Sequence, residues 1–468
     1  MSRYKHNLTS CIEPSTATVL GNVANCNLDD FQKAIKSAEI AQQEYYENTS
    51  ASQRGVLLRK WYDLVIANQD DLAVILCLEN GKTISEARGE IIYAASFILW
   101  FSEEAPRAYG HTIPSSLPDT TLMSTREPIG VCGIITPWNF PAAMITRKVA
   151  PALAAGCSVV VKPPSETPYS CAAFSKLAID AGIPARIFQI CPTKDRQAAT
   201  ELATNPIVRK ISFTGSTGVG KLLAKLASQS LKKLSLELGG NAAFIVFDDA
   251  DLDVAVEGAI QCKFRCSGQT CVCANRLFVQ RNVAAEFTRK LTERVSQLKN
   301  GPGLDPSVTQ GPLVNRSAVD KVIEHINDAV SKGAKVELGG NPLDNNPGFF
   351  FPPTILSGVP KDAMVAGDET FGPLAPIFTF DTEEEVIKMA NSTEFGLASY
   401  LFSENVNRCM RVSKKIQAGM VGVNTGRISA SEAPFGGIKE SGYGTEGSLY
   451  GMEEYQVIKS TIIGNTHR

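Results

Sequence analysis

The stretch from Lys210 to Lys221 reads KISFTGSTGVGK. A short run with β-branched and aromatic residues ends at Thr214, three glycines follow, and a helical pattern begins at Leu222. Glycines at a turn between a strand and a helix let backbone N–H groups and the positive helix end approach a phosphate closely. The stretch therefore predicts a strand, a phosphate-binding turn and a helix.

Two phosphate chemistries compete for this turn. Residues 215–221 nearly match the loop of nucleotide triphosphatases, but that pattern requires Ser or Thr next, to hold magnesium, and Leu222 stands there. A dinucleotide site usually has the spacing Gly-x-Gly-x-x-Gly, which this turn lacks. Taken alone, the turn leaves open both dinucleotide binding and a glycine turn that serves packing only.

The segments around the turn alternate between strands and helices. Short apolar runs predict strands at 131–136, 158–162, 187–190, 210–214 and 243–246, with helical patterns between them. Such alternation indicates parallel βαβ units and hence a doubly wound sheet. Helices are expected earlier at 28–47, 52–79 and 83–109, the last with Thr83 and Glu86 spaced as a capping box.

A second alternating region begins near Asp251. It predicts strands at 276–280, 335–338 and 375–380 and a helix at 284–298. The segment 341–351 is rich in Asn, Pro and Gly and reads as an exposed loop. The chain therefore has the pattern of two α/β domains.

Composition excludes several classes of protein. The chain has 468 residues, 44% of them hydrophobic, which is enough for a large core in two or three domains. Its 46 basic and 48 acidic residues contain no basic run that would bind nucleic acid or a membrane surface. No apolar signal segment or membrane-spanning run is visible. Twelve scattered cysteines favour reduced thiols, and we expect a soluble cytoplasmic protein.

Three short motifs carry chemistry. Cys271 lies in GQTCVCA (268–274), Glu237 begins ELGG (237–240), and Asn139 lies in PWNFP (137–141). A thiol, a carboxylate and an amide are together the parts needed for covalent oxidation of an aldehyde. Because a free thiol is only a few per cent ionised at neutral pH, it needs a base or a positive environment to attack a carbonyl.

A metal site is the competing interpretation of the cysteines around Cys271. The spacing of Cys262, Cys266, Cys271 and Cys273 is not that of paired Cys-x-x-Cys zinc ligands, and the chain has only four His. We therefore expect no metal.

These motifs, together with the 215–220 turn and ETFGP (369–373), closely resemble the aldehyde dehydrogenase superfamily, in the same order over nearly the whole chain. GQTCVC (268–273) and PFGGIKESG (434–442) are most similar to its succinate-semialdehyde branch. The resemblance implies an α/β fold with a doubly wound cofactor domain, an α/β catalytic domain and a small β oligomerisation arm. We expect these domains at 1–109 with 131–240, at 241–438, and at 110–130 with 439–468, respectively.

The resemblance also implies roles for the catalytic residues. Cys271 would attack the aldehyde, and its backbone N–H with the Asn139 amide would stabilise the oxyanion. Glu237 would activate the water that hydrolyses the resulting thioester. In some members of the branch a neighbouring cysteine forms a reversible disulfide with the nucleophile. Cys273 fits that role, with Cys266 as the alternative partner and a passive Cys273 as the third interpretation.

For the cofactor, the resemblance implies a nicotinamide dinucleotide held by a set of eight residues. They are Trp138, Lys162, Ser165, Gly215, Ser216, Gly220, Glu369 and Phe371. In NAD-selective relatives the third residue after this lysine is usually Glu, which repels a 2′-phosphate. Here it is Ser165, with Glu166 displaced by one position, so we expect NADP to be preferred and NAD to be usable.

For the substrate, Arg147, Arg265 and Ser429 match the residues that hold a terminal carboxylate in the succinate-semialdehyde branch. We therefore expect oxidation of succinate semialdehyde. The alternatives are a glutarate-semialdehyde or broader aldehyde dehydrogenase, and a catalytically silent binding relative. The intact Asn139, Glu237 and Cys271 argue against a silent relative. The arm segments imply a homodimer or homotetramer.

Overall fold

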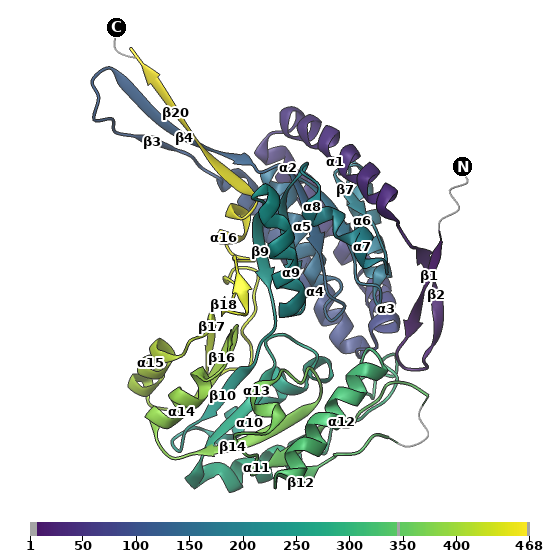
Figure 1. Ribbon diagram of the computed structural model, residues 1–468, viewed down its shortest axis with the longest axis vertical. Coiled ribbons are helices and arrows are strands. Elements are labelled where there is room, and N and C mark those ends of the chain that lie inside the picture. Colours follow the sequence, from purple (N-terminus) through teal and green to yellow (C-terminus); the bar gives the residue numbers. More distant parts are fainter. Residues whose placement is uncertain (1–6, 344–346, 466–468) are drawn as a thin grey trace.

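The computed structural model describes residues 7–343 and 347–465. Its first domain, in the upper half of Figure 1, is built on a six-stranded sheet. The strand order is β19-β9-β8-β5-β6-β7. The strands are β5 (Val131–Ile135), β6 (Ser158–Lys162), β7 (Phe188–Ile190), β8 (Val208–Thr214), β9 (Lys233–Glu237) and the antiparallel β19 (Gly442–Tyr443). The chain moves outward from β5 to β7 and returns to β8 on the other side. The predicted doubly wound sheet is confirmed, with its switch point between β5 and β8.

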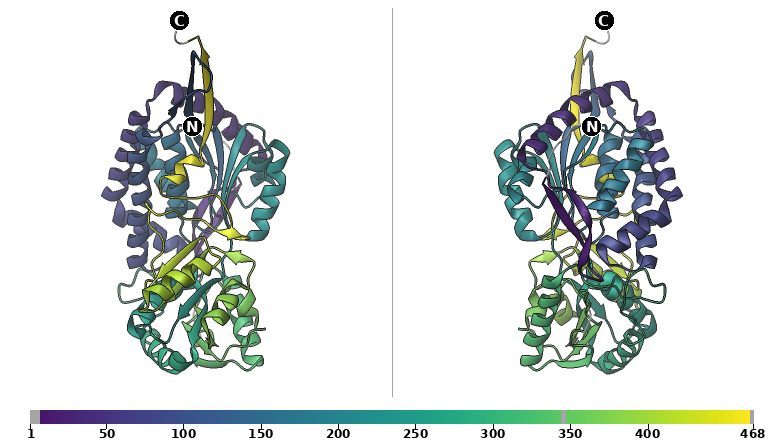
Figure 2. Two further views of the ribbon diagram at one scale, coloured as in Figure 1. Left: turned by 90° about the vertical axis from the view of Figure 1, so that its left-hand side faces the viewer. Right: turned by 90° about the vertical axis from the view of Figure 1, so that its right-hand side faces the viewer.

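Helices cover both faces of this sheet (Figure 2). They are α1 (Leu28–Asn48), α2 (Ala51–Ala67), α3 (Gln69–Asn80), α4 (Ile84–Glu104), α5 (Ala143–Ala155), α6 (Pro168–Asp180), α7 (Arg196–Ala199), α8 (Glu201–Thr204) and α9 (Thr217–Ala227). Along β6, Val159 and Val161 pack with α2 to α6, whereas Val160 packs with α1 and α9 on the opposite face. A strand buried on both faces explains the unbroken apolar run of its sequence.

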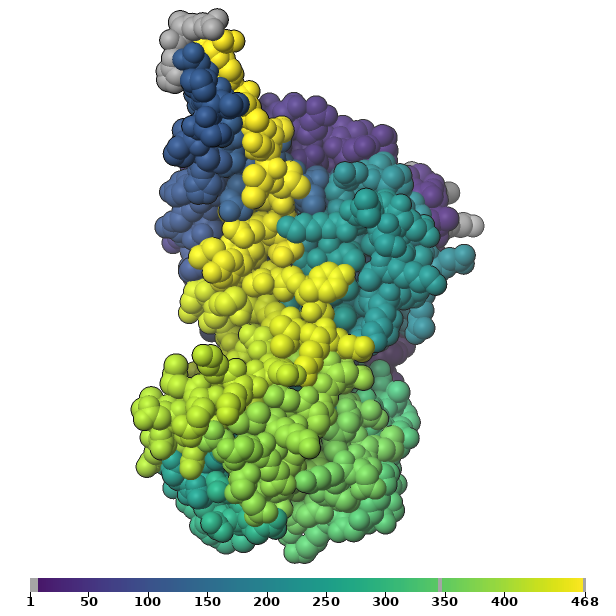
Figure 3. Space-filling view, turned by 60° about the vertical axis from the view of Figure 1, so that its left-hand side comes forward, coloured from purple at the N-terminus to yellow at the C-terminus, as the bar shows by residue number. Residues whose placement is uncertain are grey.

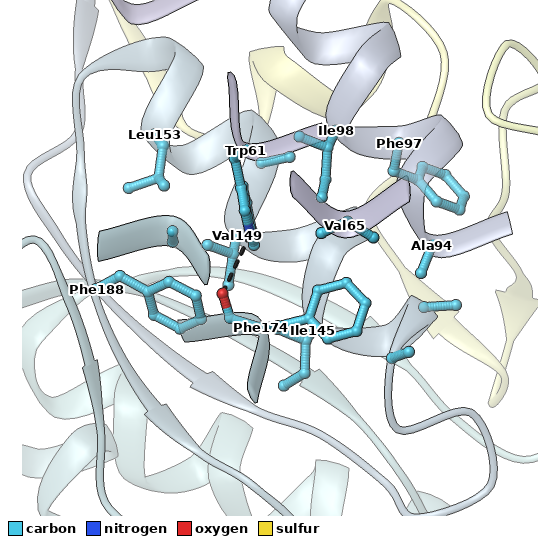
Figure 4. Packing of buried hydrophobic residues seen from close by; sticks show 14 of the residues in the cluster. Trp61, Val65, Ala94, Phe97, Ile98, Ile145, Val149, Leu153, Phe174 and Phe188 are labelled. Carbon is cyan, nitrogen blue, oxygen red and sulfur yellow. Dashed lines mark hydrogen bonds between the residues drawn. The ribbon is translucent and has the colours of Figure 1, made fainter. Parts of the chain in front are cut away.

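The core under α2 and α4 is centred on Trp61 (Figure 4). The Trp61 ring meets the rings of Phe174 and Phe188 edge to face, with centroids 6.4 and 5.9 Å away. Its indole N–H donates to the Phe174 carbonyl oxygen at 3.1 Å, so the one polar atom of the buried ring is satisfied. This packing fixes α6 against the sheet.

The second domain contains a seven-stranded sheet with the order β12-β13-β14-β11-β10-β16-β17. The strands are β10 (Ala242–Val246), β11 (Ala274–Gln280), β12 (Lys335–Leu338), β13 (Thr354–Ser357), β14 (Leu374–Phe380), β16 (Ala398–Phe402) and β17 (Met420–Val423). Around it lie α10 (Leu252–Ala259), α11 (Arg281–Val295), α12 (Arg316–Ser331), α13 (Met364–Gly367), α14 (Glu383–Asn391) and α15 (Val406–Lys415). β9 leads directly into β10, so this connection joins the two sheets (Figure 1).

A three-stranded arm projects from the first domain (Figure 3). It consists of β3 (His111–Ile113), β4 (Thr120–Pro128) and β20 (Gln456–Gly464), which pairs antiparallel with β4 along its whole length. Most of 439–455 lies outside this arm: β18 (Ile438–Lys439) pairs with β15 (Phe395–Gly396), and β19 and α16 (Tyr450–Glu453) precede β20.

Several predicted boundaries were wrong. The helix expected at 52–79 is two helices separated at Asn68, whose side chain bonds back to the Leu64 carbonyl. The next helix ends at Glu104, because Pro106 starts a short 3-10 turn at Ala105–Arg107. The helix after the glycine turn begins at Thr217, so two of the three glycines lie in its first turn.

Other elements escaped prediction or fall partly outside the described residues. An N-terminal hairpin of β1 (Leu8–Glu13) and β2 (Thr18–Ala24) was not expected, nor were β9, β13, β16 and β17. The loop at 341–351 contains no helix or strand in its described part, and 344–346 lie outside it.

Candidate active site

Four predicted site residues lie along one edge of the six-stranded sheet. Asn139 follows β5, Lys162 ends β6, Gly215 follows β8 and Glu237 ends β9. Because parallel strands point their carboxyl ends to the same edge, residues far apart in sequence form one row there. Asn139 and Gly215 flank the switch point, where ligands bind in sheets of this kind.

The segment after Glu237 brings the thiol to this edge. β10 begins at Ala242 and pairs in parallel with β11, which begins at Ala274, three residues after Cys271. At Gly240 a Cβ atom would lie 2.4 Å from the Cys271 carbonyl oxygen, so only glycine allows the two segments to approach this closely. The motif around Glu237 therefore packs directly on the turn that carries Cys271.

The turn before Cys271 has an unusual backbone. Cys266 and Ser267 have φ angles of 50° and 53°, in the left-handed region, and Gly268 follows at 75°. A Cβ atom on Gly268 would lie 2.1 Å from the Gly372 carbonyl oxygen, which explains the glycine. Non-glycine residues held in this region cluster at functional sites, because the surrounding structure must stabilise them.

The Asn139 amide faces the same turn. Its side chain is buried, and Nδ2 donates to the Gln269 carbonyl oxygen at 3.0 Å. Since an amide nitrogen has two N–H groups, one remains for another acceptor. This contact holds the amide against a residue two positions before Cys271, and a donor near a reacting thiol is the arrangement that an oxyanion hole requires.

The Cys271 thiol is protonated in this surrounding. Burial raises its pKa to about 12, and the nearby Arg147 guanidinium opposes that rise. Because the thiolate is the nucleophile, attack on a carbonyl requires removal of the proton from Cys271.

Glu237 is the carboxylate at the end of β9, and it is fully buried. Burial raises its pKa to about 8, the charge of Glu446 adds to the rise, and Arg147 and Lys148 oppose it. Its Oε2 atom lies 3.6 Å from Arg147 Nη2 and makes no hydrogen bond. A carboxyl group with a pKa near neutrality suits a general base.

Arg147 and Lys148 are held by Glu446. Arg147 Nε and Lys148 Nζ both donate to its carboxylate, and all three side chains are buried. The two cations hold the pKa of Glu446 below its usual range, although burial alone would raise it. Glu446 was not predicted as a site residue. It lies 299 residues from Arg147, and no local motif marks it.

On one side of Cys271 lies a cavity of about 210 Å³. It is lined by Pro137, Trp138, Asn139, Thr214, Gly215, Ser216, Leu238, Gly239, Cys271, Glu369 and Phe371. The rings of Trp138 and Phe371 meet edge to face, with centroids 5.5 Å apart. Six predicted cofactor residues, Trp138, Gly215, Ser216, Glu369 and Phe371 with Gly220 behind them, are therefore at or beside this cavity.

The residues of this cavity fit a nicotinamide dinucleotide. Thr214 Oγ1 is buried without a hydrogen-bond partner and lines the cavity. Gly220 packs on Leu238, where a Cβ atom would lie 2.4 Å from Leu238 Cδ2. The Gly240 N–H donates to Glu369 at 3.1 Å, and burial raises the pKa of Glu369 to about 7. Glu369 is thus fixed at the cavity wall, and its second carboxylate oxygen can accept hydrogen bonds from hydroxyl groups.

On the other side lies a larger cavity of about 560 Å³, bounded by Thr270 and Val272 beside the thiol. Arg265 and Ser429 both line it. The Arg265 guanidinium lies 4.9 Å from the centroid of Phe140, which fixes its planar group by a cation–π contact. Two substrate residues predicted 164 positions apart are thus in one cavity.

Arg147 is placed differently from the other two predicted substrate residues. It is absent from the lining of the larger cavity, and Glu446 engages its guanidinium. Tyr93 connects the two regions: burial raises the pKa of its hydroxyl, while Arg147 and Arg265 nearby lower it. Tyr93 and Arg427 line the cavity and were missed, since neither stands in a recognisable motif.

The remaining cysteines are free thiols within the described residues. Cys273 Sγ donates to the Lys263 carbonyl oxygen at 3.3 Å, and Cys266 Sγ lies 3.6 Å from Lys82 Nζ. Both are buried, and a regulatory role for either stays a prediction. Over residues 7–343 and 347–465, no group of three or more His, Cys, Asp or Glu is arranged to hold a metal ion. No helix in these ranges is long and apolar enough to cross a membrane.

The fold and this arrangement agree with the comparison to known proteins. Residues 2–461 match the aldehyde dehydrogenase family, and the chain belongs to that family of aldehyde-oxidising enzymes.

Among its relatives are two curated semialdehyde dehydrogenases. The chain is 54% identical to glutarate-semialdehyde dehydrogenase of Pseudomonas aeruginosa, over 96% of this chain and 93% of that protein. It is 53% identical to the NADP(+) succinate-semialdehyde dehydrogenase of Escherichia coli, with the same coverage. The crystal structure of succinate-semialdehyde dehydrogenase from Burkholderia pseudomallei matches with a TM-score of 0.96 and 52% identity, over 98% of this chain and 95% of that one.

Proposed function

We propose that this enzyme oxidises succinate semialdehyde to succinate with NADP, and that NAD is the weaker cofactor. The observation that supports this substrate is the cavity beside Cys271, in which Arg265 and Ser429 supply a cation and a hydroxyl. A terminal carboxylate placed there gains charge-assisted hydrogen bonds, whereas a neutral aldehyde of equal length gains none. Relatives with succinate- and glutarate-semialdehyde activity in their names support this class of substrate.

The first half of the reaction takes place at Cys271. Once its thiol proton has passed to solvent water, its sulfur attacks the aldehyde carbon, and the carbonyl electron pair moves to the oxygen. The free N–H of Asn139 and the Cys271 backbone N–H stabilise this oxyanion. A nicotinamide held in the cavity of Trp138, Glu369 and Phe371 would supply the acceptor for the hydride that leaves the same carbon. The carbonyl re-forms and a thioester on Cys271 results.

Glu237 completes the second half. Its ionised carboxylate takes a proton from water, which attacks the thioester carbon, and the carbon–sulfur bond breaks. The carboxylic acid that forms gives its proton to the departing Cys271 thiolate, so the products are succinate and the Cys271 thiol, and Glu237 releases the proton taken from water to solvent. Arg147, 3.6 Å from Glu237, orients this carboxylate and is itself oriented by Glu446.

Cofactor choice is proposed from the end of β6. Lys162 lies there with Ser165 three residues later, and the Ser165 hydroxyl donates to Glu166 at 3.1 Å. Position 165 thus presents a small neutral side chain instead of a carboxylate, which removes the repulsion of a 2′-phosphate. The E. coli and yeast relatives whose names carry NADP(+) support this choice.

An aldehyde panel tests the function. Succinate semialdehyde, glutarate semialdehyde and butanal are assayed with NADP and with NAD by the absorbance of the reduced cofactor. We expect kcat/KM for succinate semialdehyde to exceed that for butanal by at least about tenfold, since one charge-assisted bond contributes about 1.5–3 kcal/mol. Equal values for both would contradict the proposed substrate. A higher value for glutarate semialdehyde would favour the second candidate, which the Pseudomonas relative supports.

We also propose that the arm joins copies of this chain. On β20, Ile458 and Ile462 are 71% and 67% exposed, although large apolar side chains on a strand normally find cover. A second chain would cover them and pair with the strand edge. Light scattering at micromolar protein should give a dimer or tetramer, and a mass of only 50.3 kDa would contradict the arm's role.

A further inference from the structure

The edge of the six-stranded sheet carries a second cation that no motif accounts for. β6 ends at Lys162, and β7 lies beside it in parallel register, with Val161 opposite Ile190. The chain continues past β7 for five residues and begins α7 at Arg196. Because both strands end at the same edge of the sheet, Lys162 and Arg196 come from neighbouring positions along it. The part of this edge that carries Lys162, Glu166 and Arg196 is called the rim below.

The backbone that carries Arg196 is firmly held. The Cys26 N–H donates to the Pro192 carbonyl oxygen at 2.8 Å, and the Lys194 N–H donates to Asn25 Oδ1 at 2.9 Å. The Asp195 carboxylate caps α7 by accepting from Gln197 N at 2.8 Å. Asp195 is therefore occupied with backbone N–H groups, and the base of the Arg196 side chain is fixed in place.

The charges at this rim do not balance. Over residues 7–343 and 347–465, neither the Lys162 ammonium nor the Arg196 guanidinium makes an ion pair or hydrogen bond with a side chain. Burial lowers the pKa of Lys162, Glu166 counteracts this, and the charge of Arg196 lowers the pKa further. Two cations thus repel each other at the rim, and Glu166 offsets only one of them.

This imbalance matches one particular anion. A phosphate monoester carries about −1.5 to −2 charges at neutral pH. Among the charges that act on the Lys162 ammonium, Glu166 cancels the charge of Lys162 itself, and Arg196 supplies the net positive charge. With Arg196 the net charge is positive, and its planar fork can bind phosphate oxygens through two N–H groups.

We propose that Arg196 is the second cation of the 2′-phosphate subsite, binding the phosphate opposite Lys162 and setting the preference for NADP over NAD. The proposal rests on the proposed function, in which the adenosine ribose lies at the end of β6. Arg196 is a binding residue for the cofactor's distal end and takes no part in the chemistry at Cys271.

The test measures binding of cofactor fragments to the full-length enzyme, independently of turnover. Titration calorimetry gives the Kd of 2′,5′-ADP, which carries the phosphate, and of 5′-AMP, which lacks it. We expect Arg196→Ala to raise the Kd of 2′,5′-ADP by about 10- to 100-fold, while the Kd of 5′-AMP changes by less than about twofold. Arg196→Lys should restore part of the loss, since it keeps the charge without the fork.

Lys194→Ala is the matched control, because Lys194 is an exposed cation two residues away whose ammonium donates to the Ser10 carbonyl oxygen. We expect it to leave both Kd values within about twofold. The Arg196 effect should also shrink in 1 M salt, where the screening length falls to about 3 Å.

Three results would overturn the proposal: no loss for Arg196→Ala, an equal loss for both fragments, or the same loss for Lys194→Ala. An equal loss of affinity for both fragments would mean that Arg196 binds the adenosine part and makes no contact specific to the 2′-phosphate. If the wild-type enzyme bound 2′,5′-ADP no tighter than 5′-AMP, the NADP site of the proposed function would itself be wrong. Retained selectivity in Arg196→Ala would instead remove this inference alone.

Discussion

The two cavities next to the segment 270–272 are built in different ways. The cofactor side, of about 210 Å³, is formed by a glycine turn, a pair of aromatic rings and one fixed carboxylate, Glu369. The larger cavity, of about 560 Å³, in which we propose that the aldehyde binds, is lined by single polar side chains from three distant segments, Tyr93, Arg265 and Ser429. Changes on the first side should act through backbone geometry, and changes on the second through charge.

Glu237, which ends β9 and lines neither cavity, carries the largest expected effect. Its pKa of about 8 means that it becomes an ionised base only as the pH rises through 8. The wild-type kcat should therefore increase with pH and level off above about pH 8. Glu237→Gln should lower kcat by about 10²- to 10⁴-fold, the usual contribution of a general base, and abolish the rising limb. A variant that kept the wild-type pH profile would show that another group is the base.

Gly240→Ala tests whether the close backbone approach to Cys271 is required for activity. Its Cβ atom would lie 2.4 Å from the Cys271 carbonyl oxygen, so the thiol-bearing turn must shift. We expect kcat/KM to fall by about 10²-fold, as for a displacement of about 1 Å at a reacting group, while binding of 5′-AMP is retained.

Gly218→Ala is the control for that variant. It lies in the glycine turn, yet a Cβ atom there meets nothing within 4 Å and its φ is ordinary. Activity should stay within about twofold of wild type in steady-state assays. Equal losses for the two variants would mean that glycine itself, and not the close approach to Cys271, is required.

Arg265→Ala tests the charged side and has the smallest expected effect. Loss of one charge-assisted bond should lower kcat/KM for succinate semialdehyde by about 10- to 100-fold and leave butanal within about threefold. Arg427→Ala removes another arginine of the same cavity and should not discriminate between the two aldehydes. Equal effects of Arg265→Ala on both substrates would refute a carboxylate contact.

The contrast between backbone geometry in the smaller cavity and single side chains in the larger one also explains which features could be predicted from the sequence. Buried parallel strands such as β6 are runs rich in β-branched residues, and the glycines at 215, 220 and 240 mark close approaches, so this edge of the sheet could be predicted. β9 was missed because its sequence, KLSLE, is short and contains no β-branched residue. The break at Asn68 depends on a side-chain bond to Leu64 that periodicity does not reveal.

Contacts between residues far apart in the sequence also could not be predicted. Arg147 could be matched by its distance from Asn139, yet its bond to Glu446 spans 299 residues and depends on the tertiary fold. Tyr93 lies on a helix whose apolar spacing predicts burial and says nothing about a cavity. Such contacts follow from packing between domains, and single-chain patterns do not encode them.

The most direct test of the central claim traps the covalent intermediate. Glu237→Gln is mixed with succinate semialdehyde and NADP, quenched in acid and digested, and the peptides are mapped by mass spectrometry. The account predicts a succinyl thioester on Cys271 that forms only when the cofactor is present and is absent from Cys273. An acyl group on another residue, or none at all while reduced cofactor accumulates, would contradict it.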